Sequence, residues 1–165
     1  MPMTIRTDGM EELGAMLARL NDKAQDVASG ALFDGAGVVG DAMRAAVNSI
    51  VTEDFHYVAD PDSAGKRYAS PDEKAALVGK TGIAKFRKDS DSVDTLIGIS
   101  GAAGYATVGG KQKAVRLIAR SINSGTTFMQ KQPVFRQAKA KATGPAQAAL
   151  LAKAEQMFNE IIGGN

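Results

Sequence analysis

The longest helical pattern in this chain covers residues 22–50, which read DKAQDVASGALFDGAGVVGDAMRAAVNSI. Apolar residues recur there at spacings of three and four, which places them on one side of a helix. This apolar side is formed by Val27, Ala31, Val38, Ala42, Ala46 and Val47, and is widened by Val39, Met43 and Ile50. The pattern predicts one long, slightly bent helix over residues 22–50.

Four glycines interrupt the same stretch, at positions 30, 35, 37 and 40. Each of them costs a helix interior up to about 1 kcal/mol relative to alanine. A helix that keeps all four is either broken near Gly35 or packed closely against another backbone. The unbroken helix agrees better with the continuous apolar pattern, so it is the form that we predict.

Three further helices are predicted around this one. The first runs from Gly9 to Leu20 with the same apolar spacing, and Asn21-Asp22 separates it from the long helix. Another covers Ala114 to Ile122. The last lies between Pro133 and Ile162, and is expected to bend or split at Pro145, because proline has no amide N–H to donate within a helix.

Short strands are predicted between these helices. Gly82–Lys88 and Val93–Ile99 suit the two arms of a hairpin, and Tyr105–Val108 suits a third strand. Residues 52–80 contain the turn sequences Asp-Pro-Asp-Ser and Ser-Pro-Asp, which favour a long loop.

The sequence therefore predicts an α+β fold, in which two N-terminal helices and a long C-terminal helix pack on a small antiparallel β-sheet. We expect a single domain over residues 1–165. Within it, residues 52–80 are predicted to form a long loop, residues 123–133 an extended arm, and residues 163–165 a frayed terminus.

The composition excludes several kinds of functional site. The chain has no cysteine, which excludes disulfides, zinc–thiolate sites, iron–sulfur clusters and thiol nucleophiles. It has one histidine, His56, which excludes metal sites built on two histidines. No apolar run approaches the roughly 20 residues that span a bilayer, and the first residues lack the pattern of a signal peptide. We expect a protein of a reducing cytoplasm that holds no metal or cofactor and is not an enzyme.

Three short motifs resemble ligand or catalytic sites but lack essential residues. Gly79-Lys80-Thr81 resembles the end of a phosphate-binding loop, but position 74 is lysine where that loop has glycine. Asp60-x-Asp62 resembles the start of a calcium loop whose later ligand positions are occupied by alanine and proline. Asp54 and His56 are the basis for a third possibility, a small hydrolase, and no nucleophile or metal partner has a suitable spacing from them.

Charge is unevenly distributed along the chain. Residues 1–63 hold four basic and eleven acidic residues, a net charge of −7, whereas residues 64–165 have a net charge of +9. Eight basic residues and no acidic one lie between Lys111 and Lys141. Three interpretations remain open: a solvated surface with uneven charge, copies of the chain that pair acidic with basic regions, or a nonspecific contact with DNA phosphates.

One stretch is distinctive, residues 118–138, which read IARSINSGTTFMQKQPVFRQA. It combines an Asn-x-Gly-Thr turn, a short extended segment, and a Gln-Pro pair followed by phenylalanine at the start of a helix. In these features the chain resembles the small neck and tail-completion proteins of long-tailed double-stranded-DNA bacteriophages. It departs from their pattern in two places. Val134 separates Pro133 from Phe135, and the long 52–80 loop stands where those proteins carry a Pro-x-Asp-Thr-Gly-x-Leu segment.

The resemblance implies a structural virion protein without catalytic activity, assembled in the cytoplasm of the host bacterium. It implies a ring, expected to be hexameric, in the neck or at the head-proximal end of the tail. Such a ring joins the tail tube or its terminator to the head connector around the DNA channel. The implied partners are other copies of the chain, neighbouring neck, connector, tail-tube or terminator proteins, and DNA in the lumen, with no membrane contact.

Two groups of residues are candidates for these contacts. The candidates for contact between subunits lie in the arm and the turn before it: Asn123, Gly125, Thr126, Phe128, Met129, Pro133 and Phe135. The candidates for contact with an acidic partner or with DNA are basic: Lys111, Lys113, Arg116, Arg120, Lys131 and Arg136. The alternative function is that of a free-standing, sequence-nonspecific DNA-binding accessory protein that uses the basic stretch 111–141.

Overall fold

The computed structural model describes residues 10–53, 66–89, 92–99 and 104–163. Its helices are α1 (Met10–Asn48), α2 (Pro71–Val78), α3 (Val115–Ser124) and α4 (Val134–Ile162). Its strands are short: β1 (Thr81–Ile83), β2 (Arg87–Lys88), β3 (Val93–Asp94), β4 (Ile97–Ile99), β5 (Tyr105–Val108) and β6 (Lys111–Ala114). They form antiparallel pairs, β1 with β4, β2 with β3, and β5 with β6. The predicted α+β class is confirmed.

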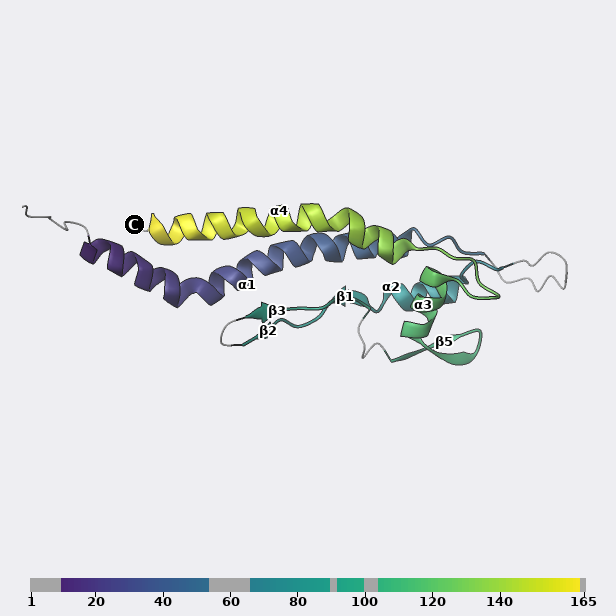
Figure 1. The fold of residues 1–165 in the computed structure, drawn as a ribbon. Coiled ribbons are helices and arrows are strands. Elements are labelled where there is room, and N and C mark those ends of the chain that lie inside the picture. Colours follow the sequence, from purple (N-terminus) through teal and green to yellow (C-terminus); the bar gives the residue numbers. More distant parts are fainter. Residues whose placement is uncertain (1–9, 54–65, 90–91, 100–103, 164–165) are drawn as a thin grey trace, which may run out of the picture.

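The molecule is elongated and has two parts, which we name the shaft and the lobe (Figure 1). The shaft consists of α1 and α4, which lie side by side and run in opposite directions. The lobe consists of α2, α3, β5, β6 and the segment 125–133, and it lies at the end of the shaft where α1 finishes and α4 begins. The far end of the shaft, where α1 begins and α4 finishes, is thus distant from the lobe.

The N-terminal part of the chain is one helix, where the sequence predicts two. α1 continues through Asn21 and Asp22 without a break, and both side chains are exposed. Asparagine and aspartate are weaker helix formers than alanine by less than about 1 kcal/mol each, a cost that the long apolar contact with α4 easily outweighs. Figure 1 shows that α1 is bent between its purple N-terminal part and its blue part.

Two glycines of α1, Gly30 and Gly35, allow close contact with α4. A Cβ atom added to Gly35 would lie 3.1 Å from the carbonyl oxygen of Ala146 and 3.3 Å from the Cβ of Leu150. A Cβ atom added to Gly30 would lie 2.6 Å from the sulfur of Met157. The two alternatives for this stretch are therefore resolved, because α1 is unbroken at Gly35 and packs closely against another backbone.

α4 is also continuous, so the predicted split at Pro145 does not occur. Proline removes one helical hydrogen bond, but the remaining bonds and the packing against α1 keep the helix together. Figure 1 shows a change of direction in the green part of α4. The helix ends at Ile162, where the Gly163 amide donates to the carbonyl oxygen of Asn159 at 2.7 Å. Gly163 thus still caps the helix, and residues 164–165 lie outside the described residues.

The predicted hairpin over residues 82–99 is confirmed, with an interruption in its middle. Ile83 pairs with Ile97 and Arg87 pairs with Asp94, so three residues on the first arm oppose two on the second. This extra residue is a β-bulge, which separates the hairpin into the β1–β4 and β2–β3 pairs.

The same hairpin lies along α1. The side-chain amide of Gln25 donates to the carbonyl oxygen of Asp89 at 2.9 Å. The rings of Phe33 and Phe86 meet with centroids 6.0 Å apart. α1 is therefore covered by α4 and by the hairpin, which explains why apolar residues occupy more than one narrow stripe of this helix.

One strand was missed by the sequence analysis. β5 was predicted, but β6 follows it after a two-residue turn formed by Gly109 and Gly110, with φ of 55° and 74°. Positive φ at both central residues is the requirement of a type I′ hairpin turn, which glycine meets without strain. The Gly-Gly pair was the available signal.

One helix was missed as well, since α2 lies within the predicted loop of residues 52–80. The Ser70 side chain accepts a hydrogen bond from the Glu73 amide, and the Glu73 carboxylate accepts one from the Ser70 amide. This reciprocal pair is a capping box, and Pro71 occupies the first helical position, where proline is favoured. Ser-Pro-Asp was interpreted as a turn, whereas the glutamate that follows makes it a helix start. Residues 54–65 of the predicted loop lie outside the described residues.

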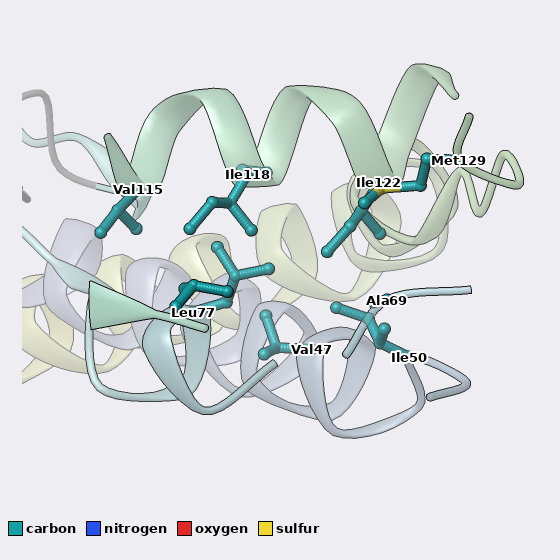
Figure 2. Close-up of a cluster of buried hydrophobic side chains, with 10 residues drawn as sticks. Val47, Ile50, Ala69, Leu77, Val115, Ile118, Ile122 and Met129 are labelled. Carbon is teal, nitrogen blue, oxygen red and sulfur yellow. The ribbon is translucent and has the colours of Figure 1, made fainter. Parts of the chain in front are cut away.

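The main hydrophobic core joins the lobe to the shaft (Figure 2). Val115, Ile118 and Ile122 lie on one side of α3 and point towards Leu77 of α2 and Val47 of α1. Three of these side chains, those of Val115, Ile122 and Leu77, are completely buried. The remaining members of the core are Ile50, Ala69, Val108, Ala119 and Met129.

Candidate interaction site

The predicted extended arm begins at Gly125, because Asn123 and Ser124 complete the last turn of α3. Gly125 has φ of 74° and ψ of 167°, a conformation that is essentially restricted to glycine. A Cβ atom there would also lie 3.0 Å from the Cβ of Lys131. The glycine is therefore required both for the exit from the helix and for the close return of the chain at Lys131.

The segment that follows is held in place by a network of hydrogen bonds. The Thr126 hydroxyl accepts from the amides of Phe128 and Met129 at 3.2 and 3.0 Å, and the Thr126 amide donates to the Met129 carbonyl at 3.1 Å. The Arg67 amide donates to the Phe128 carbonyl at 3.0 Å, and the Gln130 amide donates to the Arg67 carbonyl at 2.8 Å. The segment is thus a fixed turn bonded to residue 67 rather than a free arm.

Gln132 fixes the other end of this segment, and the sequence analysis did not identify it. Its side chain is buried and bonds both backbone groups of Val51, accepting from the amide at 2.8 Å and donating to the carbonyl at 3.0 Å. Its own amide donates to the Ile122 carbonyl at 2.8 Å. Gln132-Pro133 was noted in the sequence analysis as part of a motif. The partner of the glutamine side chain, Val51, lies 81 positions earlier in the sequence, and nothing in the residues around either position indicates that they pair.

Arg67 itself is held by a buried carboxylate. The guanidinium donates two hydrogen bonds to Glu73, at 2.7 and 2.8 Å, and the Lys113 ammonium reaches the same carboxylate at 3.1 Å. Burial alone raises the pKa of Glu73. The hydrogen bonds from Arg67, the Ser70 amide and Lys113, together with the charge of Arg67, outweigh burial and lower the pKa from 4.5 to about 2. The carboxylate therefore stays ionised and ties three segments of the lobe together.

These supports leave one large apolar side chain of the segment exposed. The side chain of Phe128 is 77% exposed, whereas its neighbour Met129 is 4% exposed and belongs to the core. An apolar ring on a backbone that is bonded on both sides loses little conformational freedom when a partner covers it, which is the usual character of an interface anchor.

The other candidates for subunit contacts divide between the surface and the interior of the chain. Thr126 is exposed, and Asn123 and Pro133 are half-buried. Phe135 is half-buried and packs against the main core. Met129 and Phe135 therefore pack against this chain's own core, and their assignment as contacts between subunits stays a prediction.

The basic candidates divide in the same way. Lys113 forms an ion pair with Glu73 within the chain, and its assignment to an external partner stays a prediction. Arg116 and Arg120 lie on the exposed side of α3, next to Leu117, which is 55% exposed. Neither arginine has an ion-pair partner in the described part of the chain. The remaining candidates are exposed: Lys111 on β6, Lys131 before α4, and Arg136 in the first turn of α4.

Among residues 10–53, 66–89, 92–99 and 104–163, no three histidine, cysteine, aspartate or glutamate side chains are grouped so that they could hold a metal ion. Asp54 and His56, the pair considered for a hydrolase, lie outside the described residues.

Comparison of the chain with protein-family models, with curated proteins and with solved structures found no match. In the described part of the chain, no helix combines the length and the apolar character needed to cross a membrane.

Proposed function

We propose that this chain is a structural subunit of a ring in the neck, or at the head-proximal end of the tail, of a tailed bacteriophage. The ring would join the tail tube or its terminator to the head connector around the DNA channel. Its partners would be further copies of the chain and the adjoining layers of the virion, and the chain would catalyse no reaction. The observation that carries this proposal is the rigid presentation of Phe128 within the phage-like stretch 118–138.

Two features support a role in assembly. The residues of the phage-like stretch are those that bond the segment 125–133 to Arg67 and Val51, so the motif has a structural purpose in this chain. That purpose is to hold the phenyl ring of Phe128 at the surface. The exposed side of α3, with Arg116 and Arg120, belongs to the same lobe. Aromatic and arginine side chains are the residue types most enriched at the centres of protein interfaces.

Replacing Phe128 with alanine is expected to weaken assembly while leaving the fold intact. The wild-type chain should self-associate in light scattering at high protein concentration and form rings in electron micrographs. The F128A variant should need at least about tenfold more protein to reach the same mass, because interface anchors of this type commonly contribute 2 kcal/mol or more. The thermal stability and circular dichroism of this variant should match those of the wild type, because the phenyl ring of Phe128 is mostly exposed to solvent in the single chain.

Two matched variants make this result specific. M129A removes the adjacent, buried side chain and should destabilise the fold by about 2–5 kcal/mol. L96A removes another exposed apolar side chain, from the segment between β3 and β4, and should change neither stability nor assembly. A wild-type chain that stays monomeric at all concentrations, or an F128A variant that assembles like the wild type, would contradict the proposal.

A second candidate function is nonspecific DNA binding by a free-standing accessory protein. The observation in its favour is that residues 104–142 contain eight basic residues and no acidic one, with Arg116 and Arg120 exposed and unpaired in the described part of the chain. A strictly monomeric chain that binds duplex DNA at submicromolar concentration in moderate salt, with affinity falling steeply as salt rises, would favour this function over the ring.

A further inference from the structure

The far end of α4 carries an apolar stripe that nothing in the described chain covers. Leu151, Phe158 and Ile162 are 60%, 39% and 48% exposed, and Glu155 is exposed between them. The positions 151, 155, 158 and 162 follow spacings of four, three and four, so they lie on one side of the helix. This side differs from the one that meets α1, where Leu150 and Met157 are half-buried near Gly35 and Gly30.

A surface of opposite charge lies at the other end of the molecule. α3 is a strongly two-sided helix: Val115, Ile118, Ala119 and Ile122 are buried, and the opposite side presents Leu117 between Arg116 and Arg120. This side has one exposed apolar side chain flanked by two cations. The stripe on α4 has apolar side chains and an anion, Glu155, whereas the exposed Glu160 lies on the opposite side of the helix.

The two surfaces cannot meet within one chain, because α3 lies in the lobe and the end of α4 lies at the far end of the shaft (Figure 1). We propose that the far end of α4 in one copy docks on the exposed side of α3 in a second copy. This inference rests on the proposed ring function and identifies the surfaces that join its subunits. Contact between two different surfaces is head-to-tail, and such contacts close into a ring when the rotation between neighbours allows it.

The chemistry of the two surfaces favours a second copy over DNA as the occupant of the α3 side. Leu117 stands at the centre of that side, where a phosphate backbone would leave it without an apolar partner. The stripe on α4 supplies apolar partners for Leu117 and the Glu155 carboxylate for the two arginines. The opposite charges of the two surfaces favour contact between α3 of one copy and α4 of the next. Contact between two α3 surfaces is disfavoured, because it would bring arginines together.

Charge reversal on each surface tests the pairing. R116E/R120E places like charges against Glu155, and E155R places a like charge against the arginines of α3. Each variant by itself should need at least about tenfold more protein than the wild type to assemble, as measured by light scattering. R87E/K88E, the same change of charge on exposed β2, is the matched control and should assemble like the wild type.

A mixture of the two reversed variants gives the decisive measurement. In an alternating assembly, the reversed α3 of one variant meets the reversed α4 of the other, and the two unreversed surfaces meet as well. The equimolar mixture should therefore assemble within about threefold of the wild-type concentration, although neither component does.

Three outcomes would overturn the inference. If both variants assemble like the wild type, the ring uses other surfaces and the proposed function still stands. If R116E/R120E fails to assemble, E155R assembles normally and the mixture shows no gain over R116E/R120E, the α3 side has an occupant other than α4. If the wild type itself never assembles, the ring function and this interface are both wrong.

Discussion

Replacing Glu73 with alanine should lower the free energy of unfolding by about 3 kcal/mol, measured by urea denaturation at neutral pH. The carboxylate is 2% exposed and accepts hydrogen bonds from Arg67, Lys113 and the Ser70 amide. Removal of one partner of a buried ion pair leaves the other charges without compensation, which typically costs 3–5 kcal/mol. We expect a loss at the lower end of this range, because the side chains of Arg67 and Lys113 are partly exposed and water can partly compensate their charges.

The same residue should make stability depend on acid. The pKa of Glu73 is about 2 in the folded chain, below its usual 4.5, so the unfolded chain binds this proton more readily. The stabilisation is complete above pH 4.5 and is lost as the pH falls towards 2. Each unit of pKa corresponds to about 1.4 kcal/mol, so this loss amounts to about 3 kcal/mol.

The two measurements check each other. The E73A variant should show less loss of stability between pH 5 and pH 2 than the wild type, by about the same 3 kcal/mol. D94A, which removes an exposed carboxylate from β3, should stay within about 0.5 kcal/mol of the wild type. If E73A and the wild type lost stability in parallel as the pH fell, the ion-pair cluster would not be what holds Arg67 and the segment beyond it.

Replacing Ile122 with alanine should lower the free energy of unfolding by about 2–5 kcal/mol. Ile122 is completely buried where α3 meets Leu77 and the core beneath it (Figure 2), and alanine would leave a cavity there. The same helix provides the control. L117A removes a side chain that is 55% exposed, so its effect on the stability of the single chain should be about 0.5 kcal/mol or less.

These two variants also separate folding from assembly. I122A should unfold at lower urea concentration and, while still folded, keep the outer side of α3 available. L117A should unfold like the wild type and assemble less well, because Leu117 lies between the two arginines of the proposed interface. Equal losses of stability in both variants would mean that the two sides of α3 are not distinguished as described.

Helices were predicted well where apolar spacing was long and regular. The pattern over residues 22–50 identified most of α1, and the glycines within it pointed to a close neighbour before α4 was known to be that neighbour. The errors occurred where local signals conflicted. Asn21-Asp22 looked like a boundary and Pro145 looked like a bend or a break, yet packing between α1 and α4 carries both helices through these positions without interruption.

The candidate site was only partly predictable for a different reason. The stretch 118–138 was recognised from its residues, and Phe128, Arg116 and Arg120 within it or beside it are exposed as a contact requires. Nothing in that stretch distinguishes Phe128 from Met129, because both are large apolar residues in a polar loop. The difference arises from the hydrogen bonds to Arg67, which turn one side chain into the core and the other outwards.

Local spacing was thus sufficient to establish the α+β class, the long helices and the hairpin of this chain, because periodic burial and turn residues are properties of neighbours in the sequence. The exposure of individual side chains depended on contacts between distant segments, such as Arg67 with residues 128–130 and Gln132 with Val51. The antiparallel course of α1 and α4 likewise placed α3 and the end of α4 at opposite ends of the molecule. Such relations exist only once the chain has folded, since they join residues that share no local pattern.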